Sequence, residues 1–167
     1  MKKICLFLIG LMVVLIVLSG VMAFLQKGVH IGDKVALVRV EGPIMDSYKA
    51  IEEIKEYSKD SSIRAIVLRV DSPGGAVAPS QEIYEEVRKA AAKKKVIVSM
   101  GSVAASGGYY ISAPASRIIA NPGTLTGSIG VIMEIPNIEG LMSKVGVKTE
   151  VIKSGRHKDM ASVFRGI

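Results

Sequence analysis

One serine stands among small residues in the segment Gly101–Tyr110, whose sequence is Gly-Ser-Val-Ala-Ala-Ser-Gly-Gly-Tyr-Tyr. Small neighbours let a substrate backbone approach the hydroxyl of Ser106 and the backbone N–H groups beside it. The apolar run Val96–Met100 predicts a strand before this serine, and Ala104–Ala113 predicts a short buried helix around it. A serine at a strand-to-helix turn is well placed to act as a nucleophile, because a helix N-terminus stabilises developing negative charge.

A second segment, Asp71-Ser-Pro-Gly-Gly75, follows an apolar strand and leads into a helix. Its two glycines permit unusual backbone dihedral angles and expose backbone N–H groups, which can bind an oxyanion. The same composition is also typical of an ordinary turn between a strand and a helix. Taken alone, the segment leaves a structural turn and an oxyanion-binding loop as alternatives.

A nucleophilic serine needs a base, and the sequence offers two candidates side by side. One alternative is a Ser-His-Asp triad of Ser106, His157 and either Asp159 or Asp71. The other uses Lys158, since a lysine can act as a base where burial keeps its amine neutral. Periodicity does not separate the two, because adjacent residues point to different sides and either could face the serine.

The N-terminus carries the longest apolar run of the chain. Ile4–Leu25 has 22 residues without a charge; as a helix it would be about 33 Å long, enough to cross a bilayer core of about 30 Å. Lys2 and Lys3 precede the run, so the positive-inside rule predicts a cytoplasmic N-terminus and an extracytoplasmic remainder. The alternative is a cleaved signal peptide with Val21-Met22-Ala23 as cleavage site, but its apolar core would be only about 7–15 residues long.

We therefore expect three regions: residues 1–25 as a cytoplasmic tip and transmembrane anchor, residues 26–33 as a linker containing His30, and residues 34–167 as the soluble domain. Alternating apolar strands and amphipathic helices predict an α/β domain with a largely parallel sheet. The expected strands are residues 35–40, 64–70, 96–100, 117–120 and 147–153, and the expected helices are residues 47–58, 79–94, 104–113 and 137–145, with a loop at 121–130.

Composition argues against nucleic-acid binding, an intrachain disulfide and a metal site. The net charge of +7 is not concentrated in one basic stripe and aromatic residues make up 5%, which disfavours nucleic-acid binding. Attraction to anionic lipid suits a tethered basic protein better. Cys5 is the single cysteine, so no intrachain disulfide can form. No group of His, Cys, Asp and Glu has the spacing of a metal site, so neither a metal nor another cofactor is expected.

Four sequence blocks occur in order along the soluble part: Asp71-Ser-Pro-Gly-Gly75, Ala104-Ala-Ser-Gly-Gly-Tyr-Tyr110, Thr124-Leu-Thr-Gly-Ser-Ile-Gly130 and Lys153-Ser-Gly-Arg-His-Lys-Asp159. Behind an N-terminal anchor, this set resembles peptidase family S49, the membrane-tethered Ser-Lys proteases of the signal peptide peptidase A type. The resemblance covers about Lys34 to Arg165. It implies a Clp protease/crotonase-like fold, a spiral of β-β-α units, and homo-oligomers in which neighbouring subunits can share a site.

The resemblance also assigns roles to individual residues. It implies that Ser106 is the nucleophile, that Lys158 is the general base, and that Ser128 orients the lysine amine. The backbone N–H groups of Gly75 and Gly107 would then form the oxyanion hole. No metal or cofactor takes part in the implied reaction.

The function implied by the resemblance is a membrane-anchored serine endopeptidase that cleaves apolar peptides such as remnant signal peptides. Because the chain ends nine residues after Lys158, where the family continues, we expect a C-terminally incomplete peptidase domain. One alternative is an inactive or assembly-dependent truncated module that binds peptides. Others are a crotonase-type acyl-CoA enzyme on the same fold, or a protease that acts on a stomatin-like membrane partner.

Overall fold

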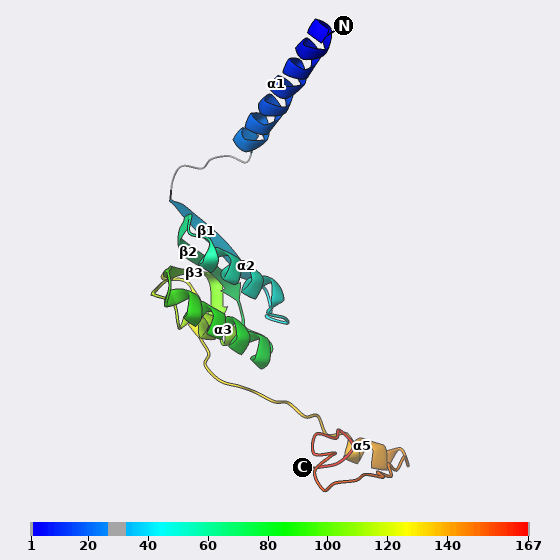
Figure 1. The fold of residues 1–167 in the computed structure, drawn as a ribbon. Coiled ribbons are helices and arrows are strands. Elements are labelled where there is room, and N and C mark those ends of the chain that lie inside the picture. Colours follow the sequence, from blue (N-terminus) through cyan, green and yellow to red (C-terminus); the bar gives the residue numbers. More distant parts are fainter. Residues whose placement is uncertain (1, 27–32, 167) are drawn as a thin grey trace. The chain divides into compact units, whose positions relative to one another are not determined.

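The computed structural model describes residues 2–26 and 33–166 of the chain (Figure 1). The chain divides into two compact units, Met1–Gly127 and Ser128–Ile167, and each unit is described by itself. Most of the predicted linker, residues 27–32 with His30 among them, lies outside the described residues.

The N-terminal helix α1 runs over Lys2–Gln26 and contains the apolar run Ile4–Leu25. Its described side chains, from Phe7 onward, are exposed. Within the described part of the chain, no helix combines the length and the hydropathy that crossing a membrane requires. The transmembrane anchor therefore stays a prediction.

The first unit is built on a parallel sheet in the order β1-β2-β3-β4, with β5 also beside β3. Its strands are β1 (Lys34–Glu41), β2 (Ile63–Ser72), β3 (Lys95–Ala105), β4 (Arg117–Ile119) and β5 (Leu125–Gly127). The helices that connect successive strands are α2 (Tyr48–Lys59), α3 (Val77–Ala91) and α4 (Gly107–Ser112). Because right-handed crossovers between sequential neighbours keep to one side, these helices share one face of the sheet, and α3 contacts both α2 and α4 (Figure 1).

Alternation of buried and more exposed side chains along most of each long strand creates the core of this unit. Val38, Leu68 and Val98 are fully buried under the helices, and each such side chain contributes about 1.5–3 kcal/mol when it leaves water. The preceding residue of each strand points to the opposite face of the sheet. These residues, Leu37, Val67 and Ile97, are also in register, and Leu37 is 47% exposed. The helices complete the core with buried apolar side chains: Ala50, Ile54, Ile83, Val87, Ala90 and Ile111.

A bulge in β3 lies just before the serine of interest. Val70 pairs with Met100, but Ser72 pairs with Ala104, so β3 has two more residues than β2 over this interval. The carboxylate of Asp71 fills the gap in the ladder by accepting a hydrogen bond from the Val103 N–H at 3.0 Å. Bulges re-aim the residues that follow them; here the bulge sets the direction in which β3 continues to Ala105.

Most predicted elements are confirmed, with ends within three residues of those expected: β1, β2, β4, α2, α3 and α5. Two boundaries were wrong. β3 continues to Ala105, so α4 begins at Gly107 instead of Ala104, because β5 pairs with Val103–Ala105 and keeps that stretch extended. For the same reason residues 125–127, expected in a loop, form β5.

The second unit contains helix α5 (Glu139–Lys144), which ends before Gly146, a residue with a φ of +76° as expected for a helix stop. The predicted strand at residues 147–153 is wrong, since the structure has no strand there and Val147, Val151 and Ile152 are exposed. A strand needs a neighbour for its backbone hydrogen bonds, and the described part of this unit supplies no such neighbour.

Replacing Leu68 by alanine tests which face of the sheet is the core. Leu68→Ala should lower the free energy of unfolding by about 2–5 kcal/mol, because it leaves a cavity under the helices. Leu37→Ala, on the opposite face of the same sheet, is the matched control and should cost less than about 1 kcal/mol. Urea unfolding followed by circular dichroism measures both; equal losses would contradict the one-sided core.

Candidate functional site

Two turns meet at the carboxyl edge of the sheet because β2 and β3 are parallel neighbours. β2 ends at Ser72 and β3 at Ala105, so the segments that follow, 73–76 and 106–107, emerge side by side. This topology brings together three of the five residues singled out from the sequence: Ser106, Gly75 and Gly107.

The two turns touch through their backbones. A methyl group added to Gly74, whose φ is +98°, would lie 2.7 Å from the Gly107 nitrogen and 2.9 Å from the Ser106 Cβ. A methyl group added to Gly107 would lie 3.4 Å from the Gly75 nitrogen and 2.6 Å from the Ser80 Oγ. The space between the turns is too small for any side chain, so both positions require glycine. The backbone nitrogens of Gly75 and Gly107 are therefore held close to Ser106.

The N–H groups of these glycines are available to a ligand. Gly74 and Ala76, on either side of Gly75, both donate to protein acceptors: Gly74 to the Ser72 Oγ at 3.1 Å and Ala76 to the Ile44 carbonyl at 2.8 Å. Among the described residues, the N–H groups of Gly75 and Gly107 have no protein acceptor. Two free backbone N–H donors beside a serine hydroxyl are the groups that form an oxyanion hole.

Ser106 itself has an unusual backbone conformation, with φ 51° and ψ −118°. A non-glycine residue reaches positive φ only at a cost of about 1–3 kcal/mol, and such strain persists where neighbours impose it. The neighbours here are β5 and α4: the Ser106 N–H donates to the Gly127 carbonyl at 2.8 Å, and its carbonyl accepts from the Tyr110 N–H at 2.9 Å. The half-buried Ser106 is therefore held at a sharp turn from strand to helix.

Ser72 supports this arrangement and was not singled out from the sequence. Its side chain is fully buried, and its Oγ accepts the Gly74 N–H, which fixes the turn that carries Gly75. A serine two residues before a glycine is a recognised turn-forming pattern, so the signal was present in the sequence. Ser80, buried on α3, acts by bulk instead: its Oγ would lie 2.6 Å from a methyl group added to Gly107.

The remaining predicted site residues belong to the second unit. Ser128 directly follows Gly127 and also has a φ of 51°. Lys158 lies in the turn region after Gly155, and its side chain is exposed, as is that of His157. Because each unit is described by itself, the pairing of Lys158 with Ser106 stays a prediction.

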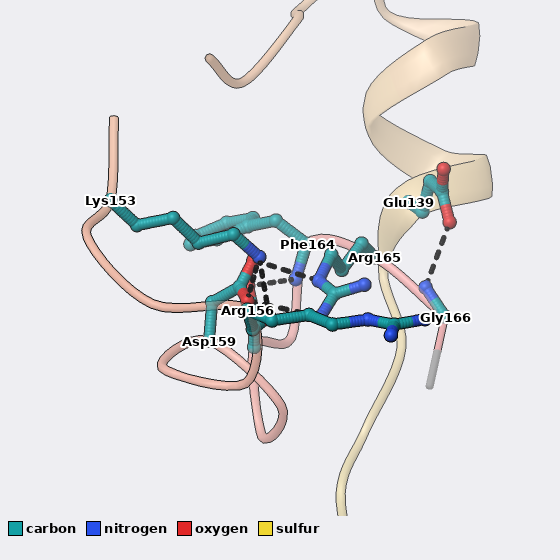
Figure 2. Close-up of polar contacts among 8 residues, drawn as sticks. Glu139, Lys153, Arg156, Asp159, Phe164, Arg165 and Gly166 are labelled. Atoms are coloured by element: carbon teal, nitrogen blue, oxygen red, sulfur yellow. Dashed lines mark hydrogen bonds and ion pairs between the residues drawn. The ribbon is translucent and has the colours of Figure 1, made fainter. Parts of the chain in front are cut away.

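The carboxylate next to Lys158 is bound by two cations (Figure 2). Asp159 accepts a hydrogen bond from the Lys153 ammonium, which also donates to the Arg156 carbonyl at 3.1 Å. Arg165 contacts both oxygens of the same carboxylate, with Nη2 3.0 Å from Oδ1 and Nε 2.8 Å from Oδ2. The hydrogen bond from Lys153 lowers the pKa of Asp159 below its usual value, opposed by partial burial and assisted by Arg165.

These contacts weaken the triad alternative. Asp159 is engaged by Lys153 and Arg165, and Asp71 accepts the Val103 N–H in the bulge, so both aspartates already have structural partners. The loop around Lys158 is also tied to α5, because the Gly166 N–H donates to Glu139 at 3.1 Å (Figure 2). Over the described residues, no three side chains of His, Cys, Asp or Glu gather into a metal site.

The fold and the serine-bearing turn define the class to which the chain belongs, the Clp protease-like α/β proteins, whose family model, Clp protease, matches residues 36–125. A second family model, Peptidase family S49, matches residues 88–167 and includes Ser106, Ser128 and Lys158. The chain belongs to peptidase family S49.

Individual relatives agree with this assignment. A Synechocystis protein named as a candidate protease is 44% identical over 133 residues, which cover 79% of this chain and 48% of that protein. The chloroplastic serine protease SPPA of Arabidopsis thaliana is 37% identical over 131 residues, covering 75% of this chain and 19% of that protein. The chain thus spans about half the length, or less, of these relatives.

A solved structure shares the fold. The 1510-N membrane-bound stomatin-specific protease, as a lysine-to-alanine variant in complex with a substrate peptide, matches with a TM-score of 0.52 and 26% identity. The match covers 62% of this chain and 48% of that one.

Ser72→Ala should loosen the turn that carries Gly75. The variant leaves the buried Gly74 N–H without its acceptor, a loss of about 1–3 kcal/mol, so the Gly74 and Gly75 amides should exchange faster. Hydrogen exchange by NMR measures this effect. Ser112→Ala is the control: Ser112 is equally buried, but its Oγ donates to the Gly108 carbonyl within α4 at 2.7 Å. Equal protection of the turn in both variants would contradict the role of Ser72.

The ion pairs of Asp159 predict an acid-sensitive loop in the second unit. Since the folded-state pKa of Asp159 is lowered, the pairing stabilises the loop at pH values above the ordinary carboxyl value of about 3.9. That stabilisation is lost as pH falls through the lowered pKa. A carbon-detected NMR titration should place the Asp159 pKa below the usual range, and Lys153→Gln should shift it upward. An ordinary pKa that Lys153→Gln leaves unchanged would show that the pairing is absent in solution.

Proposed function

We propose that this chain is a serine peptidase in which Ser106 is the nucleophile and Lys158 the general base. The observation that carries the proposal is the pair of N–H groups on Gly75 and Gly107, which have no acceptor among the described residues and lie beside the strained Ser106. Donors aimed at a developing oxyanion contribute about 3–4 kcal/mol each to transition-state stabilisation. Membership of peptidase family S49 supports the same reading.

In the proposed reaction, the neutral amine of Lys158 takes the proton of the Ser106 hydroxyl as its oxygen attacks a peptide carbonyl. The N–H groups of Gly75 and Gly107 bind the oxyanion, and Ser128 holds the lysine amine. The protonated amine then gives its proton to the leaving amine of the substrate, which leaves an acyl-enzyme. Water, activated by the same lysine, hydrolyses the ester and releases Ser106.

Several finer features belong to this proposal. We infer that α1 anchors the protein in a membrane as a single span with a cytoplasmic N-terminus, on the basis of its uncharged run and the two preceding lysines. Residues 34–167 then form an extracytoplasmic peptidase domain, a spiral of β-β-α units. Its substrates are apolar peptides such as remnant signal peptides. Homo-oligomers, with sites shared between subunits, complete the active form.

A second candidate substrate comes from the solved relative. The 1510-N protease is named as stomatin-specific and membrane-bound, and it shares this fold at 26% identity. A stomatin-like membrane partner is therefore the alternative to free apolar peptides, with the same catalytic residues.

A fluorophosphonate probe, which reacts with activated serines, tests the proposed nucleophile and base. The intact chain should label, whereas Ser106→Ala and Lys158→Ala should each reduce the labelling rate at least about a thousandfold, as losses of catalytic groups do. The matched controls are Ser102→Ala and Lys144→Ala, which remove an exposed serine and an exposed lysine outside the proposed site. Their labelling should equal that of the intact chain.

Two results would overturn the proposal. Labelling that persists in Ser106→Ala would place the reactive serine elsewhere. Labelling lost in His157→Gln but kept in Lys158→Ala would restore the triad alternative.

A further inference from the structure

A row of cations lies along the edge of the sheet opposite the candidate site. Each of the four parallel strands β1 to β4 has a basic residue at its first or second position: Lys34, Arg64, Lys95 and Arg117. The register brings the strand starts to one edge, since Lys34 pairs with Ile63, Ala65 with Lys95, and Ile97 with Arg117. The turn before β3 adds Lys93 and Lys94. We call these six residues the basic edge.

A hollow of about 650 Å³ opens within the basic edge, lined by Arg64, Lys93, Lys94 and Lys95 together with Ser61, Ile63, Ala91, Ala92 and Ser116. Lys94 has a structural task there, because its ammonium donates to the carbonyls of Tyr57, at 2.7 Å, and Asp60 near the end of α2. The other five cations are exposed.

Carboxylates at this edge do not balance the cations. Asp33 lies 3.3 Å from Arg64, but both side chains are largely exposed, and such surface pairs are weak and easily exchanged. The Asp60 carboxylate accepts a hydrogen bond from the Ser62 N–H at 2.8 Å, which stabilises the turn between α2 and β2. Six cations against these two carboxylates leave four excess positive charges, more than half of the net +7 of the chain.

Helix capping explains only part of this excess. Lys93, Lys94 and Lys95 follow the end of α3, where cations offset the negative end of the helix dipole. Lys34, Arg64 and Arg117 come five or more residues after the ends of α1, α2 and α4, outside the last helical turn in which the dipole acts. Sheets have little net dipole to offset. The common position of these three residues on one edge therefore requires another reason.

We propose that the basic edge docks on anionic lipid headgroups. The inference rests on the proposed membrane attachment through α1. Lys34 is only eight residues beyond Gln26, the last residue of α1, and eight residues reach at most about 28 Å. An inserted α1 therefore keeps the first strand near the lipid surface, where each Lys or Arg strengthens binding to anionic lipid about fivefold.

This docking fixes the height of the candidate site. Because the strands are parallel, the turns with Gly75 and Ser106 lie at the opposite ends of β2 and β3 from the basic edge. A ten-residue strand such as β2 is about 33 Å long. Docked in this way, the site stands roughly one strand length away from the headgroups, and a peptide must leave the bilayer to reach Ser106.

The test uses the full chain with Cys5→Ser and Ser61→Cys, labelled with a donor fluorophore at residue 61, beside the hollow. The protein is reconstituted into vesicles of phosphatidylcholine, with or without phosphatidylglycerol, that carry an acceptor on their headgroups. Phosphatidylglycerol should raise the energy transfer. The triple variant Lys34→Gln, Lys95→Gln, Arg117→Gln should lower the ratio of docked to undocked protein at least about tenfold, and added salt should do the same.

The matched control is Lys49→Gln, Lys55→Gln, Lys89→Gln, which removes three exposed cations from α2 and α3 at equal net charge. It should dock like the intact chain. Energy transfer that ignores phosphatidylglycerol, or that falls equally in both triple variants, overturns the role of the basic edge. Flotation with phosphatidylcholine vesicles separates this failure from failure of the anchor: a chain that does not float at all contradicts the proposed membrane attachment itself.

Discussion

Direct contact between two backbone turns is the constraint on which the rest of the first unit depends. The turn at Gly74–Gly75 and the turn at Ser106–Gly107 touch with no side chain between them. Two rigid features bring them together: the parallel pairing of β2 with β3, and the bulge in β3 that Asp71 completes. Because the turns touch through their backbones, the spacing between them is set mainly by the pairing of the two strands.

Much of the first unit could be predicted because its information is local. Short apolar runs predicted the core strands, helical periodicity predicted α2 and α3, and glycine-rich turns after two apolar strands pointed to Ser106 and Gly75. The errors arose where pairing with distant residues decides the structure. β5 extends Val103–Ala105 at the expense of α4, and residues 147–153 have strand-like composition but no described neighbour to pair with.

The site residues are divided between the two units, and the two halves differ in character. Ser106, Gly75 and Gly107 sit in a packed environment that over-determines their positions. Lys158 sits in an exposed loop whose shape depends on the ion pairs of Asp159 with Lys153 and Arg165. Spacing along the sequence supplied candidates in both halves, and the turn pattern of Ser72 with Gly74 was also present in it. The ion-pair cluster could not be foreseen, because it comes from contacts across a loop.

The positive φ of Ser106 makes folding stability and the presence of a hydroxyl group conflict at a single position. Glycine would adopt this backbone conformation without penalty, whereas serine and alanine both bear the strain. Selection for stability alone would therefore replace Ser106, the proposed nucleophile, by glycine and remove its hydroxyl. The hydroxyl of Ser106 is therefore present at a cost in folding free energy.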